Sequence, residues 1–337
     1  GHYNRGRETK AGKVNLKVPK LRNLSFETAI IERYKRREAS VEEALIEMYL
    51  AGVSVRRVED ITQALWGTRV SSGTVSKLNK KIYSSIEQWR TKELKGHYPF
   101  IYLDGISLKR SWGGEVKNVS VLVCIGVNQE GCREVLGVAE GAREDRESWR
   151  NFLRYMKQRG LKGVELVISD KSLGLIEVLG EFYPQAQWQR CVVHFYRNVF
   201  TVVPKGKRKE VAAMLRAIHA QEDRAAALQK AADVVKKLEK LRLKKAAVIV
   251  RDGIEETLPY MSFPGEFWRR IRTNNPLERI MREIRRRTRV VGNFPDGESA
   301  LMLVAARLRH IASTKWSTKQ YLNMKRLQEM NAEETVA

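Results

Sequence analysis

The order of strand and helix patterns between residues 98 and 194 restricts the possible folds of this chain more than any other feature. Three apolar, β-branched segments at 98–103, 116–127 and 133–139 come first and are joined by short turns, which predicts an antiparallel meander. Helix and strand patterns then alternate, as a helix over 144–158, a strand over 164–168, a short helix over 173–179, a strand over 186–190 and a helix from Cys191. The pattern predicts a mixed α/β domain built around these five strands.

Two aspartates follow strands of this predicted sheet. Asp104 comes directly after the first strand, and Asp170 comes just after the fourth. The β-β-β-α-β-α-β-α order resembles the ribonuclease H-like fold, in which the first and fourth strands are neighbours in the middle of the sheet. If the two strands are neighbours, both carboxylates meet at one rim of the sheet.

Such a pair of carboxylates predicts a metal site. Two close carboxylates repel each other unless a cation lies between them, and oxygen ligands with little Cys or His favour Mg²⁺ or Mn²⁺. Two such ions about 3.5–4 Å apart can activate a water or a 3′-hydroxyl and stabilise the leaving oxygen in phosphodiester chemistry.

A third carboxylate stands near the start of an arginine-rich helix predicted within residues 273–289. Asn274 or Asn275 can cap the N-terminus of this helix. Glu278 lies at the edge of the buried stripe of the helix, where it could complete a metal site with the two aspartates.

Two other interpretations of this helix stay open at the level of sequence. Glu278 could form an ordinary i,i+4 ion pair with Arg282. Glu283 could instead be the third acid. It lies about 140° round the helix from Glu278, so only one of the two glutamates can face the aspartates.

The formal net charge of the chain is +24, and its distribution favours a polyanionic partner. Residues 1–100 carry 20 basic and 11 acidic side chains, residues 101–200 carry 14 and 12, and residues 201–337 carry 29 and 16. A nearly neutral middle flanked by basic segments is typical of proteins that bind nucleic-acid phosphates. Basic ribosomal-type proteins, which carry similar charge without chemistry, are the alternative. No stretch of about 18 apolar residues is present, so a membrane partner is not expected.

Residues 40–90 contain three helix signals in succession. A capping box at 40–43 precedes the first, Ser54 caps the second, and Ser71 or Ser72 opens the third. Short helices with a glycine turn and a polar third helix favour a helix-turn-helix DNA-binding domain over an ordinary three-helix bundle. The residues of the third helix that could reach bases or phosphates include Thr74, Lys77, Lys80 and Lys81.

The three cysteines, Cys124, Cys132 and Cys191, are too few and too scattered for a disulfide framework or a four-ligand zinc site. This favours a reducing, cytoplasmic setting. Cys191 and His194 have a spacing that zinc could use, but no second pair accompanies them. We interpret them as packing and hydrogen-bonding residues that support the strand carrying Asp170.

Over about residues 5–310 the sequence resembles the IS256 (Mutator-type) family of bacterial DDE transposases. The matching motifs are, in order, Tyr102–Gly105, Gly141–Trp149 with Phe152-Leu153, Ser169-Asp170 with Gly174-Leu175, Gln189–His194 and Arg272–Pro295. The resemblance implies that Asp104, Asp170 and Glu278 are catalytic acids that hold Mg²⁺ or Mn²⁺. It also implies cleavage at transposon ends and joining of 3′-hydroxyl ends to target DNA. The chain departs from the family after Asp170, because Lys171 and Ser172 occupy a stretch where relatives usually have a histidine.

The resemblance also implies a fold class and a domain order. The class is α/β, with a ribonuclease H-like (retroviral-integrase superfamily) catalytic domain, an N-terminal helix-turn-helix region and an all-helical insertion. The expected parts are a basic arm and helix at 1–39, the helix-turn-helix domain at 40–95, the catalytic domain at 96–200 and 267–315, the insertion at 201–266 and a C-terminal tail at 316–337. The expected partners are the transposon terminal inverted repeats and target DNA. A homodimer on paired ends, associated with the bacterial nucleoid, is expected to act on them.

Basic residues at the start of the insertion and along the Glu278 helix are expected to bind DNA phosphates. They are Lys205, Lys207, Arg208, Arg272, Arg282, Arg285, Arg286, Arg287 and Arg289, and the last four should lie close to the acids. Two rival functions share most of these features. One is a nuclease of the same fold that cleaves without joining, and the other is a non-catalytic DNA-binding regulator derived from a transposase.

Overall fold

The computed structural model describes residues 2–9, 12–19, 44, 45, 48, 55–66, 70–112, 115–141, 145–291 and 297–336. These residues divide into two units, Gly1–Trp89 with Arg289–Val291 and Arg90–Thr288 with Gly292–Ala337. The second unit holds the sheet and all three predicted acids. None of the helices in the described ranges is long and apolar enough to cross a membrane.

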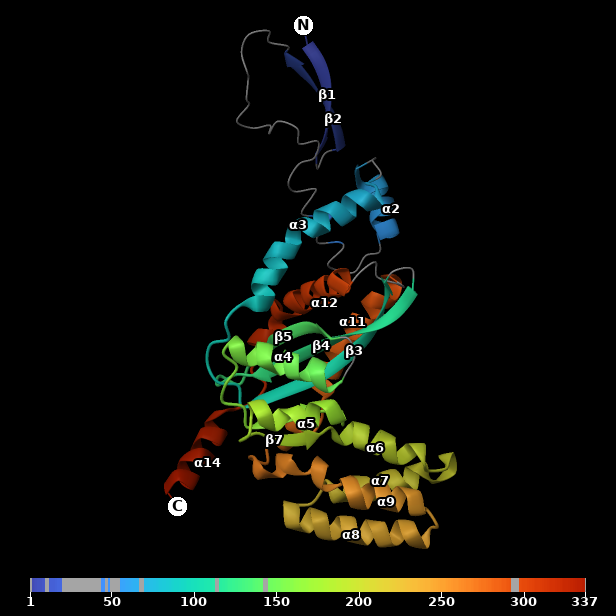
Figure 1. Ribbon diagram of the computed structural model, residues 1–337, viewed down its shortest axis with the longest axis vertical. Helices are drawn as coiled ribbons and strands as arrows, with labels where there is room; N and C mark the ends of the chain where they lie inside the picture. The colour runs from blue at the N-terminus through green and yellow to red at the C-terminus, as the bar shows by residue number, and fades with distance from the viewer. Residues whose placement is uncertain are drawn as a thin grey trace. The chain divides into compact units, whose positions relative to one another are not determined.

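The second unit is a mixed α/β structure built on a five-stranded sheet (Figure 1). Its strands are β3 (Phe100–Trp112), β4 (Glu115–Val127), β5 (Arg133–Gly141), β6 (Leu166–Ser169) and β7 (Gln187–Arg190), in the order β5-β4-β3-β6-β7. The first three are antiparallel, as the predicted meander requires. β6 is parallel to β3, with Ile101 opposite Val167. The prediction that the first and fourth strands are neighbours is therefore confirmed.

The first strand is longer than predicted. We expected it to end before Asp104, but β3 continues to Trp112 because β4 pairs with its whole length. Beyond Asp104 the strand alternates buried Ile106 and Leu108 with exposed side chains, a pattern that suits one covered face. β6 pairs only with Phe100–Tyr102, so Asp104 still lies just past the point where the β6 ladder ends.

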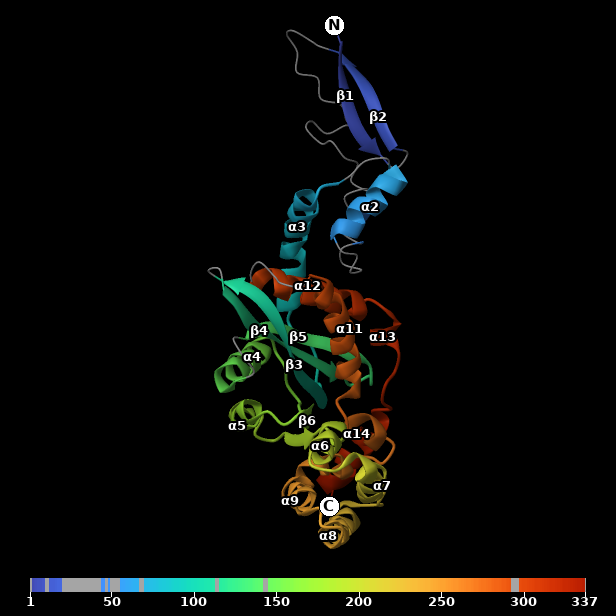
Figure 2. The same cartoon turned by 90° about the vertical axis from the view of Figure 1, so that its right-hand side faces the viewer.

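Helices cover both faces of this sheet (Figure 2). α4 (Arg146–Gln158) and α5 (Leu173–Phe182) cover one face, where Ile101 and Leu103 of β3 share an apolar core with Trp149. α11 (Asn275–Val291) lies on the other face, and its predicted stripe is buried: Leu277, Ile280, Met281, Ile284 and Thr288. Side chains alternate between the faces of a strand, so Tyr102 and Asp104 share the face toward α11.

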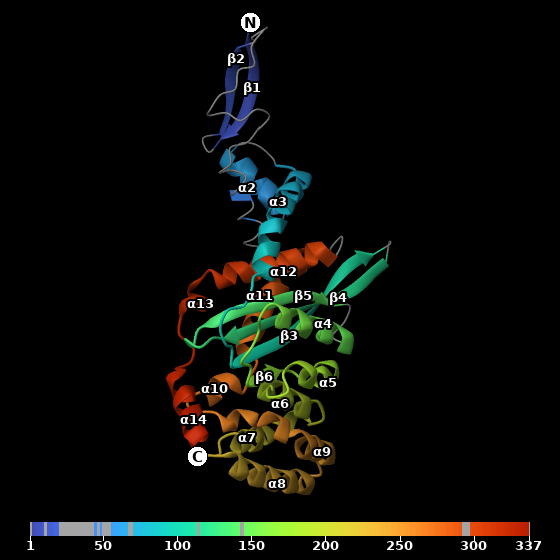
Figure 3. The same ribbon diagram turned by 60° about the vertical axis from the view of Figure 1, so that its left-hand side comes forward.

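The chain between β7 and α11 is helical and builds a core of its own (Figure 3). α6 (Val192–Thr201) is followed by α7 (Arg208–Ile218), α8 (Arg224–Lys240), α9 (Lys244–Gly253) and α10 (Trp268–Ile271), with turns of 3₁₀ helix at Lys205–Lys207, Glu255–Thr257 and Pro259–Ser262. Phe195 and Val199 of α6 pack with Leu215, Leu238 and Val250. The helical character predicted for this part of the chain is confirmed.

His219 is buried in this helical core, and its titration predicts a pH-dependent stability. Its Nε2 lies 2.9 Å from Thr257 Oγ1, and burial lowers its pKa from 6.5 to about 4. Because the folded pKa is below the unfolded one, the stabilisation is complete above pH 6.5 and is lost as the pH falls toward 4. The free energy of unfolding, measured by urea titration across this range, should fall less steeply in His219→Gln. An equal slope in both proteins would contradict the assignment.

Part of the expected C-terminal tail at 316–337 is helical. α12 (Gly297–Ala312) and α13 (Lys315–Thr318) lead to α14 (Lys325–Val336). The carbonyl of Gly131 accepts hydrogen bonds from the N–H groups of Tyr321 (2.7 Å) and Leu322 (3.1 Å). Leu322 and Leu327 are buried. The turn between β4 and β5 therefore anchors the chain before α14, whose Lys, Arg, Leu, Gln, Glu and Met residues favour a helix.

The first unit begins with a hairpin. β1 (His2–Thr9) and β2 (Gly12–Pro19) are antiparallel, so the described residues of the basic arm form a two-stranded ribbon. α2 (Val55–Trp66) and α3 (Ser72–Thr91) correspond to the predicted second and third helices, although α3 is 20 residues long. Of the predicted first helix only residues 44, 45 and 48 are described, and they are helical. The helix-turn-helix assignment remains a prediction, and the side chains of Thr74, Lys77, Lys80 and Lys81 lie outside the described part.

Candidate active site

One pocket of about 370 Å³ brings the three predicted acids together. We call it the acid pocket, and it is lined by Asp104, Gly105, Asp170, His194, Arg197, Glu278, Arg282 and Arg285. The acids come from β3, from the end of β6 and from the first turn of α11, so residues 174 positions apart in sequence (278 minus 104) meet in one place.

Backbone groups orient the two aspartates. The N–H of Gly105 donates to Asp104 Oδ1 at 2.9 Å, and the N–H of Lys171 donates to Asp170 Oδ1 at 2.7 Å. The side chain of Asp170 is 53% exposed, whereas that of Glu278 is 14% exposed. Of the two lining carboxylates, Asp170 is therefore the more accessible to solvent and Glu278 the more enclosed.

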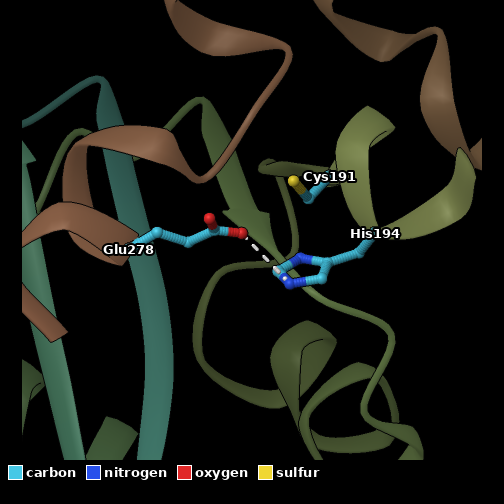
Figure 4. Close-up of side chains that lie close together, drawn as sticks. All are labelled: Cys191, His194 and Glu278. Atoms are coloured by element: carbon cyan, nitrogen blue, oxygen red, sulfur yellow. Dashed lines mark ion pairs between the residues drawn. The ribbon is translucent and has the colours of Figure 1, made fainter. Parts of the chain in front are cut away.

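His194 lies between Asp170 and Glu278. Its Nε2 is 3.1 Å from Glu278 Oε1, an ion pair marked by the dashed line in Figure 4. Its Nδ1 is 4.0 Å from Asp170 Oδ2. Sequence reasoning assigned His194 to support of the Asp170 strand and did not place it among the acids. His194 lies in the first turn of α6, which directly follows β7, the strand beside β6. This position is the sequence signal that could have placed it near Asp170.

Arg197 was missed altogether. Its Nη1 lies 3.5 Å from Glu278 Oε1, and its side chain is 58% exposed. Residues three apart on a helix share a face, so the position of His194 on α6 predicts that Arg197 reaches the same pocket.

Cys191 completes a group with His194 and Glu278 whose possible ligand atoms all lie within 4.8 Å of one another (Figure 4). Burial raises the pKa of the Cys191 thiol, and its sulfur accepts a hydrogen bond from the N–H of Asn274 at 3.2 Å. The N–H of Cys191 donates to the carbonyl of Ser169 at 2.8 Å, next to Asp170. These contacts support the predicted packing role, although the residue types would also suit a metal.

The two glutamates of α11 have different surroundings. Among the described residues Glu278 pairs with His194 and Arg197, and not with Arg282 as an ordinary surface ion pair would require. Glu283 binds three guanidinium groups, those of Arg286 (3.1 Å), Arg287 (3.3 Å) and Arg307 (2.9 Å). Burial alone would raise the pKa of Glu283, but these guanidinium groups hold it below its ordinary value. Glu278, and not Glu283, lines the acid pocket.

The predicted DNA-contact residues divide into several groups. Arg282 and Arg285 are exposed and line the acid pocket, whereas Arg286 and Arg287 bind Glu283 and do not line it. Our expectation that Arg286 and Arg287 lie close to the acids was wrong, because they occupy the Glu283 side of α11. The side chain of Arg289 is exposed.

The remaining basic residues of that prediction lie near the helical core. Lys205 and Lys207 are exposed, and Lys207 Nζ lies 3.2 Å from Glu210 Oε2. Arg208 Nε donates to the carbonyl of Val203 at 3.2 Å, and Arg272 Nη1 donates to the carbonyl of His219 at 3.3 Å. Arg272 thus links the segment between α10 and α11 to the helical core. DNA contact by these residues remains a prediction.

The arrangement suits chemistry on a phosphate ester. Three carboxylates from separate elements offer the oxygen ligands that a hard divalent cation prefers. Arg197, Arg282 and Arg285, which line the same pocket, can hold an anionic substrate beside that cation. Fold and site together define an α/β protein with one pocket that combines three carboxylates with arginines.

The chain belongs to the Mutator family of transposases, since residues 1–318 match the family described as "Transposase, Mutator family". It is 37% identical over 332 residues to the transposase for insertion sequence element ISRM5 of Rhizobium meliloti, covering 98% of this chain and 82% of that one. It is 33% identical over 327 residues to the transposase for IS256 in transposon Tn4001 of Staphylococcus aureus (96% and 83%). It is 36% identical over 326 residues to the transposase for IS1081 of Mycobacterium tuberculosis (96% and 78%). The predicted family is thereby confirmed.

Proposed function

We propose that this transposase cleaves DNA at transposon ends and joins the 3′-hydroxyl ends to target DNA, with Asp104, Asp170 and Glu278 as its catalytic acids. The observation that carries the proposal is that these three carboxylates line one pocket together with Arg282 and Arg285. The strand order β5-β4-β3-β6-β7, with β3, β6 and β7 parallel, supports a ribonuclease H-like fold for the catalytic unit.

A divalent cation, Mg²⁺ or Mn²⁺, is the cofactor that this pocket fits. Asp104, Asp170 and Glu278 would hold it through carboxylate oxygens, and two of the three carry backbone hydrogen bonds that fix their orientation. When bound, divalent cations in such a site activate a hydroxyl nucleophile and stabilise the leaving oxygen of a phosphodiester.

The chain's own residues position the substrate and the acids. Arg282 and Arg285 bind the phosphate that enters the pocket, and their guanidinium groups offset the charge that develops on it. His194 bonds to Glu278 through Nε2 and so holds this carboxylate toward the aspartates. The sulfur of Cys191 accepts the N–H of Asn274, which keeps the start of α11 against α6.

DNA is the partner that the charge supports. With a net charge of +24, the chain gains affinity for the phosphate backbone from counterion release. The expected substrates are the terminal inverted repeats and target DNA. A homodimer is expected because two ends have to be processed together.

A strand-transfer assay tests this proposal. The full chain, a labelled end fragment with a free 3′-hydroxyl, plasmid target and Mg²⁺ should yield end fragments covalently joined to plasmid. Cleavage without joining would favour a nuclease of the same fold. Tight binding without either reaction would favour a DNA-binding regulator.

A further inference from the structure

A second and larger pocket, of about 630 Å³, opens beside α11. We call it the arginine pocket, because four guanidinium groups line it: Arg133, Arg269, Arg270 and Arg279. Trp316 and Tyr321 form its aromatic wall. None of these residues lines the acid pocket.

The positive charge of the arginine pocket is not neutralised within the described chain. The carboxylate that lines the pocket is Glu283, and it binds Arg286, Arg287 and Arg307. No described carboxylate forms an ion pair with any of the four pocket arginines. Like charges gathered in one concave site raise the free energy of the empty pocket, and an anion relieves that cost.

The aromatic wall holds the innermost arginine in place. The Arg133 guanidinium lies 4.8 Å from the ring centroid of Trp316 and 4.7 Å from that of Tyr321. Its Nη2 donates to the carbonyl of Trp316 at 3.1 Å, while its buried Nε has no partner. Arg270 lies 4.8 Å from the same Tyr321 ring. Stacking on the aromatic rings fixes the orientation of the Arg133 and Arg270 guanidinium groups. Their N–H groups that have no partner among the described residues can then donate to an anion, and a planar guanidinium group suits phosphate.

The two pockets lie on the same face of the sheet, and α11 contributes residues to both. The hydroxyl groups of Tyr102 and Tyr321 both donate to the carbonyl of Arg270, at 3.2 and 3.4 Å. Tyr102 and Asp104 are two residues apart on one face of β3, a separation of about 7 Å along the strand. On α11, Glu278 of the acid pocket is followed directly by Arg279 of the arginine pocket.

We propose that the arginine pocket binds backbone phosphates of the DNA whose reacting phosphodiester occupies the acid pocket, an inference that rests on the proposed function. Neighbouring phosphates of one strand can reach both pockets because α11 contributes residues to each. Tyr102, two residues before Asp104 on β3, also bonds to the carbonyl of Arg270. A free polyphosphate or nucleotide offers the same chemistry. The adjacency of the acid pocket favours DNA, since a continuous backbone would occupy both sites at once.

The salt dependence of DNA binding tests this assignment without requiring any reaction. The full chain is titrated with a labelled duplex between about 50 and 200 mM salt, where log K falls by about 0.9 per phosphate contact for each unit of log salt. In Arg270→Gln/Arg279→Gln, two lost contacts should make the slope shallower by about 2. The variant should therefore lose about tenfold less affinity than the wild type across this range.

Two matched variants separate phosphate binding from a structural role. Arg270→Lys/Arg279→Lys keeps both charges and should keep the wild-type slope. Arg154→Gln/Lys157→Gln removes two exposed charges from α4, on the other face of the sheet, and should also leave the slope unchanged. Arg270 and Arg279 are both exposed, so none of the variants should unfold at a lower urea concentration than the wild type.

An unchanged slope in the glutamine variant of the arginine pocket would overturn the proposal. If inorganic triphosphate then raised the thermal stability of the wild type but not of that variant, the pocket would be assigned to a free polyphosphate. The outcome is independent of the catalytic proposal. Retained strand transfer in Asp104→Asn would refute the catalytic acids and leave the slope result standing.

Discussion

Replacing Glu278 by glutamine is expected to reduce strand transfer at least about a thousandfold, a loss of about 4 kcal/mol in transition-state stabilisation. Asp104→Asn and Asp170→Asn should have effects of the same size. Each change keeps the shape of the side chain but removes a charge that a divalent cation requires, and such a cation contributes several kcal/mol to charge stabilisation. The rate of joining a precut end to plasmid, measured at saturating Mg²⁺, gives the effect.

DNA binding by these variants should be retained, because removing a negative charge from a site that receives phosphates does not weaken their binding. Glu283→Gln is the matched control on the same helix. Glu283 is bound by Arg286, Arg287 and Arg307 and does not line the acid pocket, so its loss should change the rate of joining far less. An active Glu278→Gln together with an inactive Glu283→Gln would show that the third acid is Glu283.

Asn274→Ala is expected to destabilise the fold by about 2 kcal/mol and to slow strand transfer by about a hundredfold. Asn274 is fully buried, and its Nδ2 donates to the carbonyl of Leu103 at 3.1 Å, next to Asp104. Its own carbonyl accepts the N–H of Glu278 at 2.9 Å. This residue therefore fixes the start of α11 against β3. Its loss removes the buried bond to the Leu103 carbonyl and loosens the placement of Glu278 relative to Asp104.

Asn275→Ala is the control for this prediction. Asn275 is exposed at the first position of α11, so its substitution should change both quantities little. Urea unfolding gives the stability, and the joining rate per folded molecule gives the catalytic effect. A loss of stability with an unchanged rate would mean that Asn274 holds the fold together without positioning Glu278.

The side-chain partner of Asn274 could not be predicted from the local sequence pattern of α11. The sequence predicts that Asn274 or Asn275 caps the helix, because asparagine before a helical pattern commonly does so. In the structure the Asn274 backbone carbonyl accepts the bond from Glu278, but its side chain bonds to β3. The segment that packs against such a side chain decides whether it bonds to its own helix or to a neighbouring strand.

The candidate site was predicted from sequence to a large extent. Asp104 and Asp170 could be found because apolar segments precede both, and the element order indicated which strands become neighbours. The helical period of α11 separated Glu278 from Glu283, but it could not tell which of them faces the sheet. That choice depends on α6, which brings His194 and Arg197 to Glu278, and on α12, which brings Arg307 to Glu283.

The resemblance of motifs over about residues 5–310 identified the family of this protein. Local pattern by itself indicated most strands and helices of the second unit and the buried stripe of α11, because side-chain spacing and turn residues act over a few positions of the chain. Only the tertiary structure decided how far β3 extends, which arginines of α11 face the acids, and that a second pocket exists at all. Arg133, Arg270, Arg279 and Trp316 come from four separate segments, and no local signal indicates that they meet. The physical reason is that the packing of distant segments, and not the spacing within one segment, determines which charged groups share a pocket.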